Sequence, residues 1–176
     1  SKERGIITVD LKTQQQKRIS KSGASPFFHR DPQRIYFAES SVDGEVHSQK
    51  LVSVDLSGNE KREHYQGAWI SDFAISPDSQ WLAFTQRYQV YVTPFVAGGK
   101  AISTGPKASN LPVKRFSKFS GANLSWSSDS QSLNWSMGPN LYQQKLGDKF
   151  AFLNDSGEAP EDAEADVTTI QLPAKA

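Results

Sequence analysis

The sequence contains no cysteine, a single methionine and three histidines among its 176 residues. The absence of cysteine excludes a disulfide framework and a thiolate metal site. No apolar run approaches the roughly 20 residues that a membrane-spanning helix requires. No long segment keeps the 3.6-residue apolar period of an amphipathic helix. Instead the chain has 4 Trp, 5 Tyr and 10 Phe, which favours the packing of strands.

Charge is distributed unevenly along the chain. The formal net charge is +1, but residues 155–166 carry six acidic side chains and no basic one. The other residues therefore carry 20 basic and 13 acidic side chains. An acidic run of this kind is typical of a solvated loop or linker, and a cation or partner site is the alternative. Its acids lack the spacing of a calcium-binding loop.

One turn-and-strand motif recurs along the sequence. In residues 75–84, Pro77 fixes the first corner of a tight turn and the Asp78 carboxylate can accept a hydrogen bond from the backbone that follows. A mostly apolar run, residues 81–84, comes next. The same layout returns around Asp129, 51 residues after Asp78, and more loosely around Asp31. A supersecondary unit repeated at this spacing predicts a repeat architecture.

Each repeat reads as four short strands, apolar first and charged last. We therefore predict an all-β fold, a partial β-propeller of four-stranded antiparallel blades, with about three full blades and two leading strands. The predicted divisions are residues 1–20 (last two strands of an incomplete blade), 21–66 (blade), 67–120 (blade with a long basic connection, 105–121), 121–154 (blade), 155–166 (acidic loop) and 167–176 (terminal strand and linker end).

For three of the outer strands we also predict which sheet each one joins. We expect residues 100–103 to close the blade of residues 67–120, and residues 150–152 to close the next blade. The strand at 167–172 is a candidate to complete a sheet with the leading strands, in this chain or in another copy. Trp69, Trp81, Trp126 and Trp135 recur at equivalent positions. With Phe84, we predict them to form blade core rather than a ligand cage.

The repeat resembles that of TolB-like and tricorn-like propellers, of the WD40-like or PD40 type. The matching residues are Ile75-Ser76-Pro77-Asp78-Ser79, Leu82-Ala83-Phe84, Val90-Tyr91-Val92 and Gly98-Gly99. Ser79 stands where that repeat has Gly, a replacement that we expect a type I turn to tolerate. The resemblance implies the propeller fold and leaves the function open, because such propellers serve many roles.

A narrower resemblance extends over residues 69–172. Residues 89–92, 111–115 and 124–142 follow one another as in the last blades of bacterial proteins that join a TolB-like propeller to an amidohydrolase domain of the imidazolonepropionase type. This resemblance implies a parent hydrolase that acts on C–N bonds, with the adjacent amidohydrolase domain as partner. It also implies that the divalent metal is held in that domain, and that the protein is periplasmic or secreted.

The residues needed for such hydrolysis are missing from this chain. An amidohydrolase holds its metal with a His-x-His pair and further His and Asp ligands. His29, His47 and His64 stand apart, and we interpret them as ordinary blade or surface histidines. No serine lies in a Gly-x-Ser-x-Gly elbow. We therefore expect no catalytic residue, cofactor or metal in this chain.

The connection at residues 105–121 interleaves basic and aromatic side chains. Lys114, Arg115, Phe116 and Phe119 are its candidates for a docking loop. Such interleaving also occurs in nucleic-acid-binding proteins, but the chain as a whole is not basic. An inter-blade connection and a docking surface for a second domain therefore remain the two interpretations. We expect no nucleic-acid or membrane partner, and self-association through the uncovered faces of the end blades.

Three functions are compatible with these features. The leading hypothesis is a non-catalytic propeller segment of an amidohydrolase-type protein, which acts as a scaffold or controls access to the active site. The alternative is a TolB-like module that binds protein or peptide partners. An independent enzyme is disfavoured by the missing ligand set.

We predict that this chain alone binds no catalytic metal and hydrolyses no amide, because it lacks a convergent set of His and Asp ligands. Elemental analysis of the purified chain, combined with an amide-hydrolysis assay with and without added Zn²⁺, checks this. Stoichiometric zinc together with metal-dependent turnover would contradict it.

Overall fold

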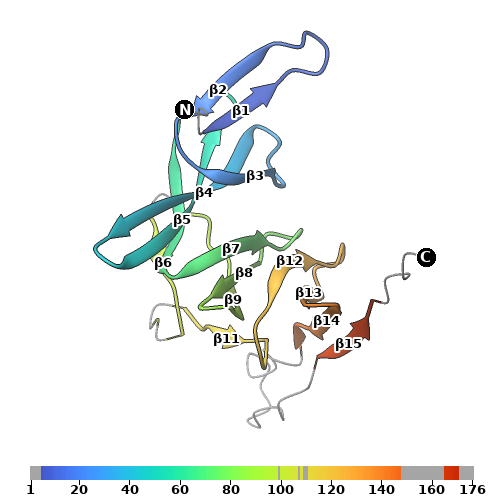
Figure 1. The fold of residues 1–176 in the computed structure, drawn as a ribbon. Coiled ribbons are helices and arrows are strands. Elements are labelled where there is room, and N and C mark those ends of the chain that lie inside the picture. The colour runs from blue at the N-terminus through green and yellow to red at the C-terminus, as the bar shows by residue number, and fades with distance from the viewer. Residues whose placement is uncertain (1–4, 99, 107, 109–110, 148–164, 171–176) are drawn as a thin grey trace, which may run out of the picture. The chain divides into compact units, whose positions relative to one another are not determined.

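The computed structural model describes residues 5–98, 100–106, 108, 111–147 and 165–170 (Figure 1). All of its regular elements in these residues are strands. Their Cα positions cluster into two units, residues 1–70 with 96–110 and residues 71–95 with 111–176. Each unit is described by itself below. None of the described residues belongs to a helix long and apolar enough to cross a membrane.

The first unit contains a two-stranded and a five-stranded sheet (Figure 1). Strands β1 (Ile6–Val9) and β2 (Gln16–Ser20) pair antiparallel as the two leading strands. The second sheet is a meander of β3 (Ala24–Phe28), β4 (Arg34–Asp43), β5 (Val46–Asp55) and β6 (Arg62–Ala68), with β10 (Ile102–Ser103) at its edge. The isoleucines of β1 and β2, Ile6 and Ile19, form a buried cluster with Ile35, Phe37, Val52 and Val54.

The position of β10 corrects one prediction. Residues 100–103 were expected to close the blade of residues 67–120, but Ile102 and Ser103 pair in parallel with Tyr65 and Gln66 of β6. The Thr104 N–H donates to the Gln66 carbonyl over 2.9 Å. Gly67 permits this approach, since a Cβ there would lie 2.8 Å from the Thr104 carbonyl oxygen.

The second unit contains two four-stranded sheets. One has the order β11 (Lys114–Arg115), β9 (Gln89–Pro94), β8 (Trp81–Gln86) and β7 (Ile70–Ile75), so the basic connection supplies its outer strand. The other runs β12 (Ala122–Trp126), β13 (Ser132–Met137), β14 (Asn140–Lys145) and β15 (Asp166–Thr169).

Strand β15 shows which strand the predicted terminal strand, at residues 167–172, pairs with. It pairs antiparallel with β14, from Asn140↔Thr169 to Gln143↔Asp166, and does not pair with the leading strands. The earlier prediction of that pairing is therefore wrong in this chain. The proposed closing strand at 150–152 and nearly all of the acidic run lie outside the described residues.

A buried cluster lies between the two sheets of the second unit. It contains Val90 and Val92 of β9, Leu133 and Trp135 of β13, and also Ala83, Phe116 and Leu146. Trp135 is only 1% exposed, and Trp81 and Trp126 pack against the cluster while partly buried. The Trp126 indole donates to the Ala74 carbonyl over 3.0 Å, so β12 is also bonded to β7. Phe84 is buried and stacks on Tyr91.

Trp69 does not belong to the predicted core. Its side chain is 37% exposed and contacts the His47 ring, with 5.6 Å between centroids. The residue lies between β6 and β7 with φ of +60°, and its N–H donates to the His47 carbonyl over 2.6 Å. This left-handed backbone interrupts the strand alternation that would have directed the indole inward.

The chain is therefore all-β, and its four-stranded antiparallel meanders are blades of a partial β-propeller, as predicted from the repeat. In each unit, neighbouring sheets bury apolar side chains against one another. This mutual cover is what a blade requires, since a single sheet cannot bury its own faces.

Replacing Trp135 and Trp69 by alanine should distinguish a tryptophan in the core from one at the surface. We expect Trp135→Ala to lower the free energy of unfolding by about 3–5 kcal/mol, because it opens a cavity between two sheets. Trp69→Ala should cost less than about 1 kcal/mol, because its ring is partly solvated. Urea denaturation of both variants measures this. Equal losses would show that one of the two indoles has been misplaced.

Candidate functional site

The predicted turns have the same hydrogen bonds in both clear repeats. Asp78 Oδ1 accepts from the Gln80 N–H over 3.0 Å, and Asp129 Oδ1 accepts from the Gln131 N–H over 3.0 Å. In each turn the serine two residues before the aspartate donates its hydroxyl to that carboxylate. Asp31 repeats only part of this, accepting from Gln33 N–H over 2.9 Å. These aspartates are structural.

The turn keeps its closing hydrogen bond with Ser79 in place of glycine, because the Ser79 N–H donates to the Ser76 carbonyl over 2.8 Å. Ser79 lies at φ +62°, and Ser130 of the next repeat has the same angle. This is the left-handed region, which glycine adopts at little cost and serine does not. The glycine of the resembling repeat fits the backbone better than the serine present here.

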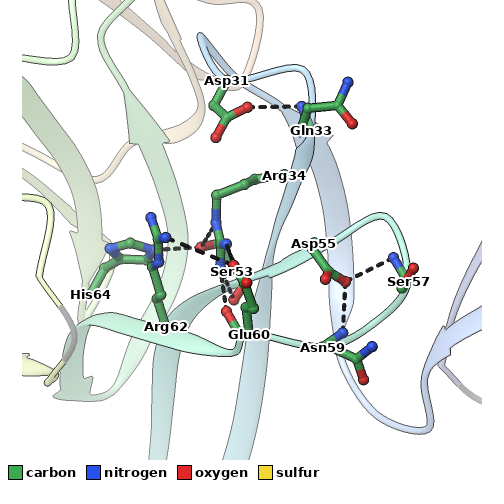
Figure 2. Close-up of polar contacts among 10 residues, drawn as sticks. All are labelled: Asp31, Gln33, Arg34, Ser53, Asp55, Ser57, Asn59, Glu60, Arg62 and His64. Atoms are coloured by element: carbon green, nitrogen blue, oxygen red, sulfur yellow. Dashed lines mark hydrogen bonds and ion pairs between the residues drawn. The ribbon is translucent and has the colours of Figure 1, made fainter.

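A buried polar cluster joins three strands of the first unit (Figure 2). The Arg34 side chain on β4 donates from Nε to Ser53 Oγ over 3.1 Å and from Nη2 to the Glu60 carbonyl over 2.6 Å. Ser53 Oγ on β5 lies 2.8 Å from His64 Nε2 on β6. All three side chains are buried. The His64 ring also stacks on Tyr36, 5.2 Å between centroids.

Arg34 fixes the direction of one hydrogen bond in this cluster. The guanidinium can only donate, so Ser53 Oγ accepts from it. Because a hydroxyl oxygen can accept a second hydrogen bond, the Ser53 hydroxyl either donates to His64 Nε2 or accepts from the Nε2–H, depending on the His64 tautomer. Burial, and after it the charges of Arg34 and Arg62, together lower the pKa of His64 from 6.5 to about 4. The cation would be desolvated beside two guanidinium groups.

The Ser53–His64 pair has the distance of a catalytic dyad but not its setting. A nucleophilic serine must be presented to a substrate. Ser53 is fully buried, and its oxygen already accepts from Arg34. The cluster instead fastens β4, β5 and the β5–β6 turn, where Arg34 Nη1 also lies 3.5 Å from Glu60 Oε2. We conclude that it is structural.

The predicted docking loop divides into anchors and exposed residues. Lys114 and Arg115 form strand β11, paired with Val92 and Tyr91. Phe116 is buried in the cluster between the sheets, so its prediction as a docking residue is wrong. Phe119 is 61% exposed. A single loop thus inserts one phenylalanine into the core and leaves the other in solvent.

The loop that carries Phe119 is bonded to β9 at one end and to the β8–β9 turn at the other. The Val90 N–H donates to Ser117 Oγ over 2.9 Å, and the Phe116 N–H donates to the Val90 carbonyl over 2.8 Å. At the other end, the Gly121 N–H donates to the Tyr88 carbonyl over 2.7 Å. A Cβ on Gly121 would lie 2.5 Å from Val90 Cγ2 and 2.6 Å from Trp135 Cδ1, so this end requires glycine.

The clamped loop places Lys118 and Phe119 beside the β8–β9 turn, which consists of Arg87 and Tyr88. These four residues line an open surface hollow of about 550 Å³ with Gln89, Ser120 and Met137. We call Arg87, Tyr88, Lys118 and Phe119 the basic–aromatic platform. Tyr88 is 78% exposed, and Lys118 Nζ lies 6.0 Å from the centre of the Phe119 ring.

Sequence reasoning missed Arg87 and Tyr88. The available signal was a two-residue hairpin turn between residues 86 and 89 that contains no Gly, Asn or Asp. Such turns require positive φ at one or both central residues. Arg87 and Tyr88 have φ of +47° and +70°. Positive φ is uncommon for residues with side chains of this size.

The three histidines do not form a metal site. His47 contacts Trp69, whereas His29 and His64 both contact the ring of Tyr36. Within the described ranges, no group of three or more His, Asp or Glu side chains could hold a metal ion.

No family model matches the sequence, and no curated protein matches it. Solved structures that resemble the fold include an acylaminoacyl peptidase of Pyrococcus horikoshii, with 16% identity, a TM-score of 0.42 and coverage of 65% of this chain and 17% of that one. The β-propeller domain of the Trilobed protease from Pyrococcus furiosus gives 13% identity, a TM-score of 0.46, and coverage of 70% and 39%. The tricorn protease gives 14% identity, a TM-score of 0.37, and coverage of 93% and 25%.

This chain therefore spans well under half the length of each of these structures. The fold assignment rests on the order and pairing of its own sheets.

The buried histidine predicts a pH dependence of stability. Because the folded state lowers the pKa of His64 from 6.5 to about 4, its contribution is fully present above pH 6.5 and is lost as the pH falls toward 4. The loss should reach about 3 kcal/mol, at roughly 1.4 kcal/mol for each pKa unit. Urea denaturation between pH 7 and pH 4 measures it.

Two variants serve as controls for this titration. His64→Gln should flatten the dependence between pH 6.5 and pH 4, because the titrating group is gone. His47→Gln changes an exposed histidine and should keep the slope. A wild-type curve that matches His64→Gln would contradict the prediction.

Proposed function

We propose that this chain is a non-catalytic β-propeller module that docks and positions another protein domain. The observation that carries the proposal is the basic–aromatic platform, in which Tyr88 is exposed on the β8–β9 turn and Phe119 on a loop that is hydrogen-bonded to β9 and to that turn. A rigid surface with exposed aromatic and cationic side chains has the composition of interaction hot spots. The Ser53–His64 pair, which is buried, offers no competing catalytic function.

The partner that we propose is an amidohydrolase-type domain of the same protein. Support comes from the ordered resemblance of residues 89–92, 111–115 and 124–142 to the blades that precede such a domain. In this arrangement the propeller is a scaffold beside the active site and limits which substrates reach it. The hydrolase domain supplies the metal ligands, and the propeller supplies none.

A separate peptide partner is the second candidate. The open hollow that the platform lines, about 550 Å³, is wide enough for side chains of a bound segment to rest on it. A module of the TolB type that binds protein or peptide partners would use such a surface without any hydrolase domain.

The docking proposal is tested by mixing two separately produced proteins. The gene is sequenced beyond the codon for residue 176. If it encodes a domain with a His-x-His motif, that domain is expressed alone and mixed with this chain. We expect a complex by analytical ultracentrifugation. Lys118→Glu combined with Phe119→Ala should weaken it at least tenfold, because charge and ring contacts are lost together.

Lys145→Glu is the matched control for that experiment. Lys145 is exposed at the end of β14 opposite the β13–β14 turn, away from the platform loop. It should leave the complex intact. Absence of an encoded hydrolase domain, or a complex equally sensitive to both charge reversals, would argue against the proposed docking.

A further inference from the structure

We propose that this chain associates head to tail, with the free edge of β15 in one copy paired with the free edge of β1 in the next. The partner is a second copy of the chain. The interface is one continuous sheet, made of the leading strands of one copy and strands β12 to β15 of the other. This inference goes beyond the docking function, because neither edge contains a residue of the basic–aromatic platform.

Each of the two strands has a strand neighbour on one side only, within the part of the chain that the structure describes. Strand β1 pairs with β2 alone, and β15 lies at the end of its sheet and pairs with β14 alone. The sheet of β1 and β2 has half the strands of a four-stranded blade. An unpaired edge exposes backbone donors and acceptors that a strand of another chain can satisfy.

A hydrogen bond next to β1 shows which of its backbone groups point outward. The Asp10 N–H donates to the Gln15 carbonyl over 2.9 Å. Bonded and non-bonded pairs alternate along an antiparallel ladder. Thr8 is therefore bonded to β2, and Ile7 and Val9 direct their N–H and C=O groups away from it. The irregular step in this ladder lies before Ile7, so residues 7–9 form a regular edge.

The same reasoning gives the outward groups of β15. The Ile170 N–H donates to the Pro139 carbonyl over 2.8 Å. Thr168 is therefore bonded to β14, and Val167 and Thr169 direct their N–H and C=O groups outward. Each edge thus offers two alternate residues, which is the spacing at which antiparallel strands exchange pairs of hydrogen bonds.

The side chains of both edges also favour pairing. Ile7 and Val9 are 46% and 47% exposed, and Val167 is 54% exposed. β-Branched residues favour strands, and an added strand would cover part of their apolar surface. Strand β1 contains no charged residue, and β15 contains only Asp166 at its start.

The other edges of the described sheets have features that oppose pairing. Strands β10 and β11 are only two residues long, and β2 carries Lys17 and Arg18. Strand β3 contains Pro26, and the registers of β3 and β12 are both irregular. Short length, charge, proline and bulges are the usual means by which proteins prevent pairing at an edge.

Strand β7 is occupied in a different way. The Asp72 carboxylate accepts from the Phe73 N–H over 2.9 Å, and the Ala74 carbonyl accepts from the Trp126 indole over 3.0 Å. Its edge is therefore bonded by side chains of its own unit. This leaves β1 and β15 as the two unprotected edges of the described sheets.

Charge complementarity favours contact between β1 and β15 over contact between two identical edges. The leading hairpin, residues 5–21, carries four basic side chains and one acidic one, Asp10. The Asp10 carboxylate accepts from the Lys12 and Thr13 N–H groups of its own turn. Strand β15 begins at Asp166, the last of six acidic residues in 155–166. Opposite charges attract at the mixed contact, whereas two copies of either edge would repel.

The test measures molar mass by light scattering of the full chain from low to high micromolar concentration. We expect the mass to rise with concentration beyond that of a dimer, because a contact between two different edges leaves one of each kind free. High salt should reduce this association, because it screens the attraction between the hairpin and the acidic residues. A wild-type chain that stays monomeric over the whole range would overturn the proposal.

Two proline variants identify the edges. Val9→Pro removes an outward N–H from β1, and Val167→Pro removes one from β15, without taking a hydrogen bond from either sheet. Each variant alone should stay monomeric. Their equimolar mixture should form a one-to-one dimer, because each copy keeps the edge that the other lacks. Self-association of either variant alone, or a monomeric mixture of two folded variants, would overturn the proposal.

Charged variants give the same comparison should a proline unfold its strand, which circular dichroism detects. Val9→Glu and Val167→Lys each place a charge of the same sign as the opposing segment at the contact. Each should weaken self-association at least tenfold, and mixing the two should restore it. Val42→Lys, at a valine of β4 that is 61% exposed, and Lys118→Glu with Phe119→Ala should leave it unchanged. Equal weakening by these controls would contradict pairing through β1 and β15.

Discussion

The structure depends on the need of each β-sheet to have its faces covered by a neighbouring sheet. In the second unit, Trp135 and Leu133 of one sheet meet Val90 and Val92 of the other, and Phe116 enters the same space from a loop. In the first unit, Ile6 and Ile19 of the leading strands cover Ile35 and Phe37. Almost every other feature either closes a turn between these packed strands or occupies the edge of a sheet.

The polar groups fall into two sets, one at the turns between the packed strands and one buried inside the fold. Ser76 and Asp78, repeated as Ser127 and Asp129, satisfy the backbone at exposed turns and fix where each inner strand begins. The cluster of Arg34, Ser53 and His64 lies inside the fold, where Ser53 Oγ bonds both the Arg34 guanidinium and the His64 ring. A buried serine–histidine pair can therefore serve stability alone, when an arginine already occupies the serine oxygen.

The fold was predictable because the repeat is local. Residues 75–84 contain the turn and the apolar strand within ten positions, so one sequence pattern determines both. Contacts between residues far apart in the sequence could not be predicted from such a pattern. Residues 102–103 pair with β6 because Gly67 leaves room, and Trp69 faces solvent because its φ is positive. Phe116 and Phe119 are three residues apart in one basic loop, and only the packing shows that one is core. Arg87 and Tyr88 went unnoticed because composition does not reveal backbone conformation.

The pairing of β10 with β6 has a consequence for the order in which the fold can form during synthesis. The chain completes β6 at residue 68, but the strand that covers its edge comes 34 residues later, after β7, β8 and β9. The first unit is thus assembled from two separate stretches of sequence. As the chain leaves the ribosome, the edge of β6 stays open until residue 103 has emerged, and an open edge is a site for pairing with other chains. Arg62 and Glu63 at the start of β6 are charged side chains of the kind that disfavours such pairing.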